Sequence, residues 1–404
     1  MVKPNEERGL RVPYALSVYG NEEIDAVSTI LKEHKTHLSE KTNKFEGQVA
    51  EIFGKKYGIM VNSGSSANLL ALELLNLEQN SKVITPVLTF STTLAPIIQK
   101  KLEPIFVDVG LNSYVANIDD IEKKINSEIK ALMIPSLLGN LPNLKRISEL
   151  SKKNEIAYIE DSCDTLGAKF NGKPTGTFSS ISTTSFYGSH IITAAGGGGM
   201  LCVNDDKWNR RARILRGWGR SSAVDESEDA NKRFGVQVEN IQYDSKFIFE
   251  EIGYNFLPLE ISAAFGLEQL KRLNGFIKTR RSNFSELRTF FLKYKEFFNL
   301  PEQLPEADSV WLAFPLTVKE DAPFKRLDIV KHFEESNIQT RPIFTGNVLR
   351  QPAFKNIKAA EFKNDFPNAD YIMKNGLLIG CNQGLEKKHL DKIKEVSSKF
   401  LDKF

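Results

Sequence analysis

Cysteine and histidine are scarce in this sequence: the 404 residues include 3 cysteines and 5 histidines. Cys163, Cys202 and Cys381 lie far apart and form no CxxC pair, which argues against a disulfide framework or a structural zinc site. A reduced, cytoplasmic setting is therefore expected. Long hydrophobic runs are also missing, since none approaches the ~20 residues of a membrane span. The N-terminal stretch MVKPNEERGLRVPYAL lacks the apolar centre of a signal peptide.

Neither sign of charge is in large excess. The 54 Lys and Arg residues against 51 Asp and Glu residues give a formal net charge of +3, so neither nucleic acid nor a membrane surface is expected as the main partner. The chain is 41% hydrophobic and 26% charged, as is usual for a globular protein. Its length suits roughly two or three domains.

Short β-rich runs alternate with helical patterns between about residues 25 and 205. Buried strands are predicted at 56–62, 82–88, 103–109, 129–139 and 156–161, and helical spacing is found at 66–75 and 143–154. This alternation is typical of an α/β fold whose large, mostly parallel sheet is covered by helices. Ligands of such sheets bind at the carboxyl ends of the strands.

A smaller domain is predicted after the long helical pattern at 260–298. Strand patterns at 309–319, 337–344 and 375–381 lie among helices there. We therefore expect a large domain over residues 1–284, with an N-terminal arm, and a small α+β domain over residues 285–404. The polar stretch 219–240 has no clear period and is expected to be an exposed insertion or loop.

The turn Ser63-Gly64-Ser65-Ser66 joins a predicted strand to a predicted helix. Free backbone N–H groups and the helix dipole make such a turn suitable for a phosphate, and the serine hydroxyls add donors. The alternative is a serine-capped helix without a ligand, because serine is a favoured N-cap.

Two carboxylates follow the predicted strand that ends at Asp161. Asp161 lies at the edge where ligands bind, and a carboxylate there can pair with a protonated ring nitrogen of a cofactor. Taken by itself, an aspartate in this place more often caps the following turn. Asp164 could orient a ring hydroxyl or face solvent.

The segment SFYGSHIITAAGGGGM contains His190 and four consecutive glycines. Histidine exchanges a proton near neutral pH, which makes His190 a candidate general acid and base, although an isolated histidine is more often structural. The glycines fit neither the P-loop nor the dinucleotide fingerprint. They allow close approach of the backbone to another segment.

Six motifs follow one another in the chain: SGSSANLLAL, VLTFSTTLAP, EDSCDTLGA, GTFSSISTTSFYGSHIIT, GYNFLPLEISAAFGLEQL and RPIFTGN. Together they resemble the sugar aminotransferase/dehydratase family, from about residue 25 to the C-terminus. The resemblance implies a fold type I pyridoxal phosphate enzyme with the aspartate aminotransferase fold, forming a homodimer and acting on a nucleotide-linked keto sugar. Most members have a lysine where this chain has His190. The histidine branch resembles 3-dehydratases of GDP-4-keto-6-deoxymannose and of CDP-4-keto-6-deoxyglucose, and the latter carry an iron–sulfur cluster.

Matching positions imply roles for individual residues. His190 matches the catalytic base, and Tyr187 a tyrosine near the site. The resemblance implies that seven residues contact the cofactor: Gly64, Ser65, Phe90, Asp161, Asp164, Ser185 and Asn255. Asn255 is implied to do so in the site of the partner subunit. The sugar-side loop is implied to use Arg341, Phe344 and Asn347.

The cluster-bearing relatives use four cysteines, and this chain departs from them. Only Cys163 remains, because Ser222, Val224 and Ala230 stand at the approximate places of the other three. A [2Fe–2S] cluster needs about four protein ligands, so no cluster and no metal is expected. Gly196 stands where many relatives have glutamate.

A histidine cannot tether the cofactor as a lysine does, but it can move protons. The resemblance therefore implies a C3 dehydratase of a nucleotide-linked 4-keto-6-deoxy sugar. Pyridoxamine phosphate is its working form, L-glutamate regenerates that form, and ammonia is released. Alternatives are dehydration driven by a partner reductase, a sugar 4-aminotransferase, and a non-catalytic binding module. The nucleotide, GDP, CDP or dTDP, stays open.

Overall fold

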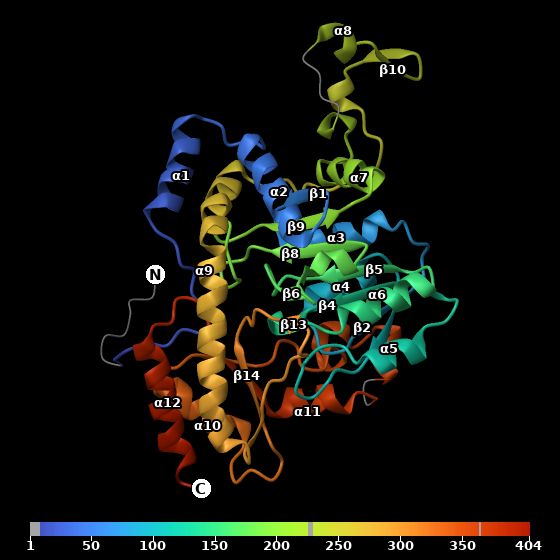
Figure 1. The fold of residues 1–404 in the computed structure, drawn as a ribbon. Helices are drawn as coiled ribbons and strands as arrows, with labels where there is room; N and C mark the ends of the chain where they lie inside the picture. The colour runs from blue at the N-terminus through green and yellow to red at the C-terminus, as the bar shows by residue number, and fades with distance from the viewer. Residues whose placement is uncertain (1–8, 225–228, 363–364) are drawn as a thin grey trace.

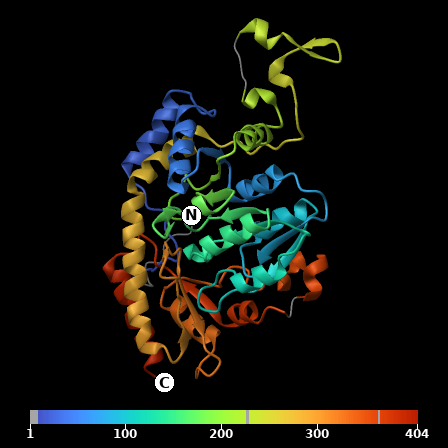
Figure 2. The same ribbon diagram turned by 45° about the vertical axis from the view of Figure 1, so that its right-hand side comes forward.

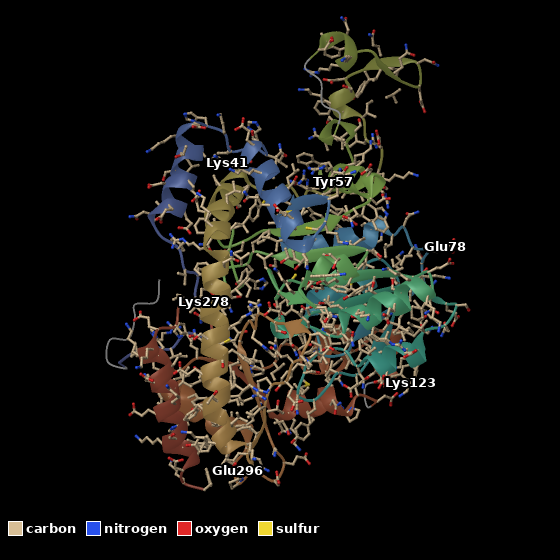
Figure 3. All side chains as sticks on the ribbon, in the orientation of Figure 1. Lys41, Tyr57, Glu78, Lys123, Lys278 and Glu296 are labelled. Atoms are coloured by element: carbon tan, nitrogen blue, oxygen red, sulfur yellow. The ribbon has the colours of Figure 1, made fainter. Side chains whose placement is uncertain are left out.

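The computed structural model describes residues 9–224, 229–362 and 365–404. Figure 1 shows a sheet with helices on both faces, one long helix along its side, a smaller sheet below it, and an extension above it. Exposed charged side chains such as those of Lys41, Glu78 and Lys123 lie around the outside (Figure 3).

The main sheet has seven strands within the described residues, in the order β1-β9-β8-β5-β4-β2-β3. Only β9 runs antiparallel to its neighbours. The bounds are β1 Tyr57–Val61, β2 Lys82–Pro86, β3 Glu103–Val107, β4 Ile129–Pro135, β5 Ala157–Asp161, β8 Ile181–Ser185 and β9 Gly199–Val203. The five early strands predicted from the sequence are all present, with shorter ends, and the expected mostly parallel α/β sheet is confirmed.

Alternation along the strands divides the core into two layers. Ile59 and Val61 pack into one hydrophobic cluster with α3 (Gly64–Leu74), α4 (Ser91–Gln99) and α7 (Asp206–Arg216). Met60 packs into the other, with helices α2 (Glu40–Phe53), α5 (Ile118–Lys124), α6 (Leu144–Lys153) and the first part of α9 (Glu260–Phe291). Successive side chains of a strand point to opposite faces, so nearly continuous apolar strands are what a sheet covered on both sides requires.

A second sheet follows helix α9, which runs down the side of the molecule (Figures 1 and 2). Its order is β12-β14-β16-β15, with bounds β12 Phe298–Asn299, β14 Phe314–Val318, β15 Thr340–Arg341 and β16 Gly376–Ile379. Helices α10 (Arg326–Glu335), α11 (Pro367–Asn375) and α12 (Lys387–Leu401) belong to the same part of the chain. The expected boundary between residues 284 and 285 falls inside α9, and the domain division stays a prediction.

Three further short strands and the N-terminal residues connect the two parts. Strand β13 (Ala307–Asp308) pairs with β6 (Lys169–Phe170), which pairs with β7 (Lys173–Pro174). Helix α1 (Asn21–Lys32) packs on α9. In the segment before α1, Val12 forms a bridge to Ile338, and Ser17 Oγ donates to the carbonyl of Gly188, 2.6 Å away. The N-terminal segment thus ties the small sheet to the loop that follows β8.

The polar stretch 219–240 lies in the extension at the top of Figure 1. The structure forms α8 (Ala230–Arg233) and a hairpin of β10 (Val236–Val238) and β11 (Ile241–Tyr243), while residues 225–228 lie outside the described residues. Within the stretch, Phe234 and Val238 are each 45% exposed. The expectation of exposure is confirmed, and the hairpin is an addition to it. No helix in the described part of the chain is long and apolar enough to cross a membrane.

Candidate active site

A cavity of about 480 Å³ opens at the carboxyl ends of β4, β5 and β8. Its size lies within the ~300–1,000 Å³ of small-molecule sites. Ten of the sequence-predicted residues line it: Gly64, Ser65, Phe90, Asp161, Asp164, Ser185, Tyr187, His190, Arg341 and Phe344. Residues scattered over almost 300 positions therefore meet in one place, because the ends of parallel strands converge at one edge of the sheet.

The start of helix α3 forms one wall of the cavity. Ser63 is its N-cap, with Oγ accepting from Ser66 N at 3.1 Å, and the backbone of Gly64 and Ser65 follows at the cavity surface. A Cβ atom on Gly64 would lie 2.6 Å from Ser185 Cβ and 3.0 Å from Cys163 Sγ. Glycine is required here because the backbone passes this close to β8. Unpaired N–H groups at a helix start favour an anion.

Asp161 lies at the end of β5 with a carboxylate that is already oriented. Its Oδ2 accepts from Asn68 Nδ2 and from Thr93 Oγ1, both at 2.8 Å, and its Oδ1 accepts from Cys163 N at 3.2 Å. Hydrogen bonds to the ionised form stabilise it. Asn68 and Thr93 were not identified from the sequence. Their signal, polar residues on the buried faces of two helices, becomes readable only once both helices are placed beside β5.

Asp164 is buried beside the same cavity. Its Oδ2 accepts from Leu138 N at 2.9 Å, and Leu138 adopts φ 58° to place that N–H there, a conformation that non-glycine residues rarely take. Burial, together with the neighbouring charge of Asp161, raises the pKa of Asp164 to about 7. A protonated Asp164 can donate a hydrogen bond into the cavity, which an ionised carboxylate cannot do.

His190 follows β8 in a turn held by the bond from its own N–H to the carbonyl of Tyr187. Its Nδ1 lies 3.2 Å from the Ser185 carbonyl. Because a carbonyl only accepts, the proton of the neutral ring is assigned to Nδ1, and the free electron pair to Nε2. Burial lowers the pKa of His190 to about 4. The ring is therefore neutral at physiological pH, in the form that accepts a proton.

Aromatic rings surround the mouth of the cavity. Phe90, at the N-cap of α4, is 51% exposed, and its ring lies 5.8 Å from that of Phe344. Tyr187 is 61% exposed. In the same segment as Phe344, the Arg341 guanidinium lies over the Tyr14 ring at 5.6 Å. Tyr14 lines the cavity but was missed in the sequence, since nothing in its N-terminal segment marks it as a partner of a strand over 300 residues later.

Two predicted site residues lie outside the cavity lining. Asn255 is exposed and forms a bridge to Gly217, so it contributes nothing to the cavity of its own subunit. Asn347 is fully buried. It caps the 3-10 helix Val348–Arg350, and its Nδ2 donates to Asp370 at 2.9 Å. This geometry supports a positioning role in the loop and does not support the sugar contact expected for Asn347.

The residues of the cavity fit pyridoxal phosphate. The helix start with its obligatory glycine suits a phosphate, the exposed Phe90 ring suits a flat heterocycle, and oriented Asp161 suits a protonated ring nitrogen. The buried hydroxyl of Ser136, also in the lining, has no hydrogen-bond partner within the described residues, which leaves it available to a ligand. None of the described residues in the lining is a lysine.

The places that correspond to cluster cysteines lie in different elements of the fold. Cys163 lines the cavity. Ser222 belongs to the 3-10 helix Ser221–Ala223, and its Oγ donates to the Lys246 carbonyl at 3.2 Å, while Ala230 begins α8 in the extension. No group of three potential metal ligands is found among the described residues.

The chain is similar to known proteins over most of its length. Residues 18–397 match the DegT/DnrJ/EryC1/StrS aminotransferase family. The lipopolysaccharide biosynthesis protein RfbH of Salmonella typhimurium is 37% identical over 372 residues, covering 89% of this chain and 84% of that protein. The GDP-4-keto-6-deoxy-D-mannose 3-dehydratase of Escherichia coli O55:H7 is 33% identical, over 96% of this chain and 99% of that protein. A crystal structure of GDP-4-keto-6-deoxymannose-3-dehydratase with a trapped PLP–glutamate geminal diamine has a TM-score of 0.84 at 32% identity, covering 95% of this chain and 99% of that one.

Proposed function

Since the chain belongs to the DegT/DnrJ/EryC1/StrS aminotransferase family, we propose that it is a pyridoxal phosphate-dependent C3 dehydratase of a nucleotide-linked 4-keto-6-deoxyhexose. The observation that carries this proposal is a buried histidine, His190, which lines the cavity with Asp161 and Asp164 where the resemblance implies a lysine in most of the family. Similarity to the 3-dehydratase of Escherichia coli supports the reaction class.

The cofactor is proposed to bind between the start of α3 and the end of β5. Gly64 and Ser65 offer backbone N–H groups, and Ser185 a hydroxyl, to its phosphate. Phe90 packs on the ring, and Asp161 keeps the ring nitrogen protonated. When bound in its amine form, the cofactor supplies an amine for the sugar ketone and a ring that takes up an electron pair.

His190 moves the proton in this proposal. Nε2 of the neutral ring would take up a proton on the cofactor side of the cavity and would give it to the C3 hydroxyl as that group leaves as water. Nδ1 stays bonded to the Ser185 carbonyl, which holds the ring in one orientation. Since histidine forms no covalent tether, the amine is released as ammonia rather than transferred to the sugar.

L-Glutamate is proposed as the amine donor, and the reaction balances with it. The sugar exchanges its C3 hydroxyl for hydrogen, while glutamate becomes 2-oxoglutarate and ammonia. The relative with a trapped PLP–glutamate geminal diamine supports this donor. Glutamate and free thiols are both typical of the cytoplasm, where we place the reaction; all three cysteines are free.

A homodimer completes the proposed site. Asn255 is exposed and does not line its own cavity, which supports its reaching the cofactor phosphate of a second copy. Arg341 and Phe344 are proposed to contact the sugar, because both line the cavity on the side of the small sheet.

An absorbance titration tests the function. Protein loaded with pyridoxal phosphate is titrated with L-glutamate, and the aldehyde band is expected to give way to the pyridoxamine band. GDP-, CDP- and dTDP-linked 4-keto-6-deoxy sugars are then added separately, and one of them should lose the C3 oxygen with release of ammonia. An amino sugar as product would instead establish an aminotransferase, and an unchanged spectrum with glutamate would favour a partner reductase.

A further inference from the structure

Arg280 connects helix α9 to the segment that carries His190. Its side chain is fully buried, at 1% exposure. Nε donates to Gln383 Oε1 at 2.6 Å, Nη1 to the Leu312 carbonyl at 2.9 Å, and Nη2 to the His190 carbonyl at 3.4 Å. One planar guanidinium thus connects α9 to Gln383, to the Leu312 backbone before β14, and to the turn that carries His190. A fork with fixed geometry is suited to such multiple bonding.

Gln383 extends this contact to the next residue. Because its Oε1 accepts from Arg280, its Nε2 is directed to the Ile191 carbonyl, 3.2 Å away. Two consecutive carbonyls, those of His190 and Ile191, are therefore held by two side chains bonded to each other. Among the described residues, the imidazole has one hydrogen bond, between Nδ1 and the Ser185 carbonyl, and looser contacts with Asp164 and the Tyr187 ring. Its distance from the reacting atoms depends on where this backbone lies.

The charge of Arg280 is balanced by no carboxylate within hydrogen-bonding distance among the described residues. Its acceptors are carbonyls and one amide oxygen. Burial lowers the pKa of Arg280 to about 10, so it remains a cation at neutral pH. Burying a guanidinium in this way is costly, and a structural brace could be built from neutral side chains. The charge of Arg280 also lowers the pKa of His190, although burial of the imidazole is the larger cause.

We propose that Arg280 and Gln383 are positioning residues for the dehydration, holding the His190–Ile191 backbone so that the imidazole reaches the proton it transfers. This inference rests on the proposed function of His190. The pair touches no reacting atom. Its effect is on the placement of the ring and on the field around it. The charged and titratable groups around the imidazole are Asp161 at the end of β5, Cys163 and Asp164 after it, Tyr187 in the turn of His190, Arg280 on α9, and Tyr14 and Arg341 in the cavity lining.

Three variants separate geometry from charge and from general damage. Arg280→Lys keeps the charge but loses the fork. Gln383→Glu keeps the acceptor for Arg280, loses the donor to Ile191, and adds a negative charge. Arg281→Lys is the matched control, because Arg281 is the next residue of α9 and bonds to the Ser309 carbonyl and to Asp308, away from the cavity.

The expected result is a loss of kcat of roughly 10- to 100-fold in Arg280→Lys and Gln383→Glu, with little change in KM for the sugar, since misplacement of an acid–base group affects the reacting geometry. The acid limb of the kcat–pH profile should move to higher pH in Gln383→Glu, because the added carboxylate offsets Arg280 and favours the protonated imidazole. It should stay in place in Arg280→Lys. Arg281→Lys should behave like the parent.

An NMR titration of the His190 imidazole in the cofactor-free protein gives a readout without turnover. The signal is assigned by its loss in His190→Asn, and its midpoint should rise by about 1 pH unit in Gln383→Glu. Two results would overturn the inference. One is the parent kcat in both Arg280→Lys and Gln383→Glu. The other is an unshifted imidazole midpoint in Gln383→Glu together with a loss of kcat in Arg281→Lys as large as in the other two variants. If the parent makes no 3-deoxy sugar, the proposed function fails, and the NMR midpoint still decides whether this pair controls His190.

Discussion

Nε2 of His190 lies 3.9 Å from Oδ1 of Asp164, and burial shifts the pKa values of the two groups in opposite directions. The pKa of His190 falls to about 4 and that of Asp164 rises to about 7. Between these values both side chains are uncharged, so a proton acceptor and a proton donor face the same cavity. A site of this kind serves acid–base catalysis better than ion pairing, because each group holds the form that its task requires.

Asp164→Asn should make the folded protein more stable relative to the parent as pH rises. Asp164 has a usual pKa of 3.8 and a folded value of about 7, so the folded chain retains a proton that the unfolded chain releases. The parent therefore loses stability between about pH 4 and pH 7, on the order of 4 kcal/mol when complete. The amide has no such dependence. Melting temperatures of both cofactor-free proteins at intervals from pH 4 to pH 8 check this.

His190→Asn is the complementary control. With a usual pKa of 6.5 and a folded value of about 4, His190 costs the parent stability as pH falls from about 6.5 to 4, because the unfolded chain takes up the proton first. The variant should lose less over that range. A constant difference in melting temperature between either variant and the parent would contradict the assigned protonation states.

Gly64→Ala should impair cofactor binding through packing. Its Cβ would lie 2.6 Å from Ser185 Cβ, so either β8 or the start of α3 must move. Overpacking of this kind costs about 1–3 kcal/mol in stability, and it disturbs the N–H groups offered to the phosphate. Equilibrium binding of pyridoxal phosphate, followed by absorbance, should weaken at least tenfold. Gly275→Ala is the control, because a Cβ on this α9 residue would meet nothing within 4 Å.

Thr93→Val should weaken the reaction without enlarging the cavity. Valine has nearly the shape of threonine but cannot donate the 2.8 Å bond to Asp161 Oδ2. The loss should cost about 1 kcal/mol in stability and lower kcat by roughly tenfold, since Asp161 then supports the protonated ring nitrogen less well. Steady-state kinetics and thermal unfolding of the variant measure both. Parent kcat would show that the bonds from Asn68 and from Cys163 N are enough to orient this carboxylate.

The sequence predicted the five early strands of the main sheet and the chemistry-bearing residues at their ends, because buried parallel strands are apolar throughout and the turns after them are short. It did not predict Asn68, Thr93 or Arg280. Each of these is a polar residue inside a helix, and its partner lies in an element distant in the chain. Only packing of α3, α4 and α9 against the sheet brings these partners together.

Asn347 shows the opposite limit. Its place in the motif RPIFTGN suggested the sugar side, yet in the fold it caps Val348–Arg350 and bonds to Asp370. Asparagine serves as well in a loop as in a binding site, so the residue type alone did not distinguish the two. The extension was expected to be exposed, but its hairpin was not predicted. The residues of β10 and β11 show no clear alternation of apolar and polar side chains.

His190→Lys should change how the cofactor is held. A lysine in this turn can form a covalent bond with the pyridoxal aldehyde, which borohydride reduction makes permanent. The modified peptide containing residue 190 should then be found by mass spectrometry in the variant and not in the parent. Dehydration should fall by at least 100-fold. The lysine amine would hold the cofactor covalently at the expense of its free form, and it would also change the group that transfers the proton. Dehydration at the parent rate would contradict the role given to His190.

Mixed dimers test whether Asn255 serves the partner's site. His190→Asn and Asn255→Ala subunits are each expected to give nearly inactive homodimers. If Asn255 crosses the interface, a heterodimer has one site with both defects and one site with neither, so about half of the parent activity per dimer should return on mixing. If Asn255 serves its own subunit, each site of the heterodimer carries one defect and no activity returns. Differently tagged subunits, co-expressed and purified by both tags, give the heterodimer directly, and the exposed position of Asn255 outside its own cavity leads us to expect the recovery.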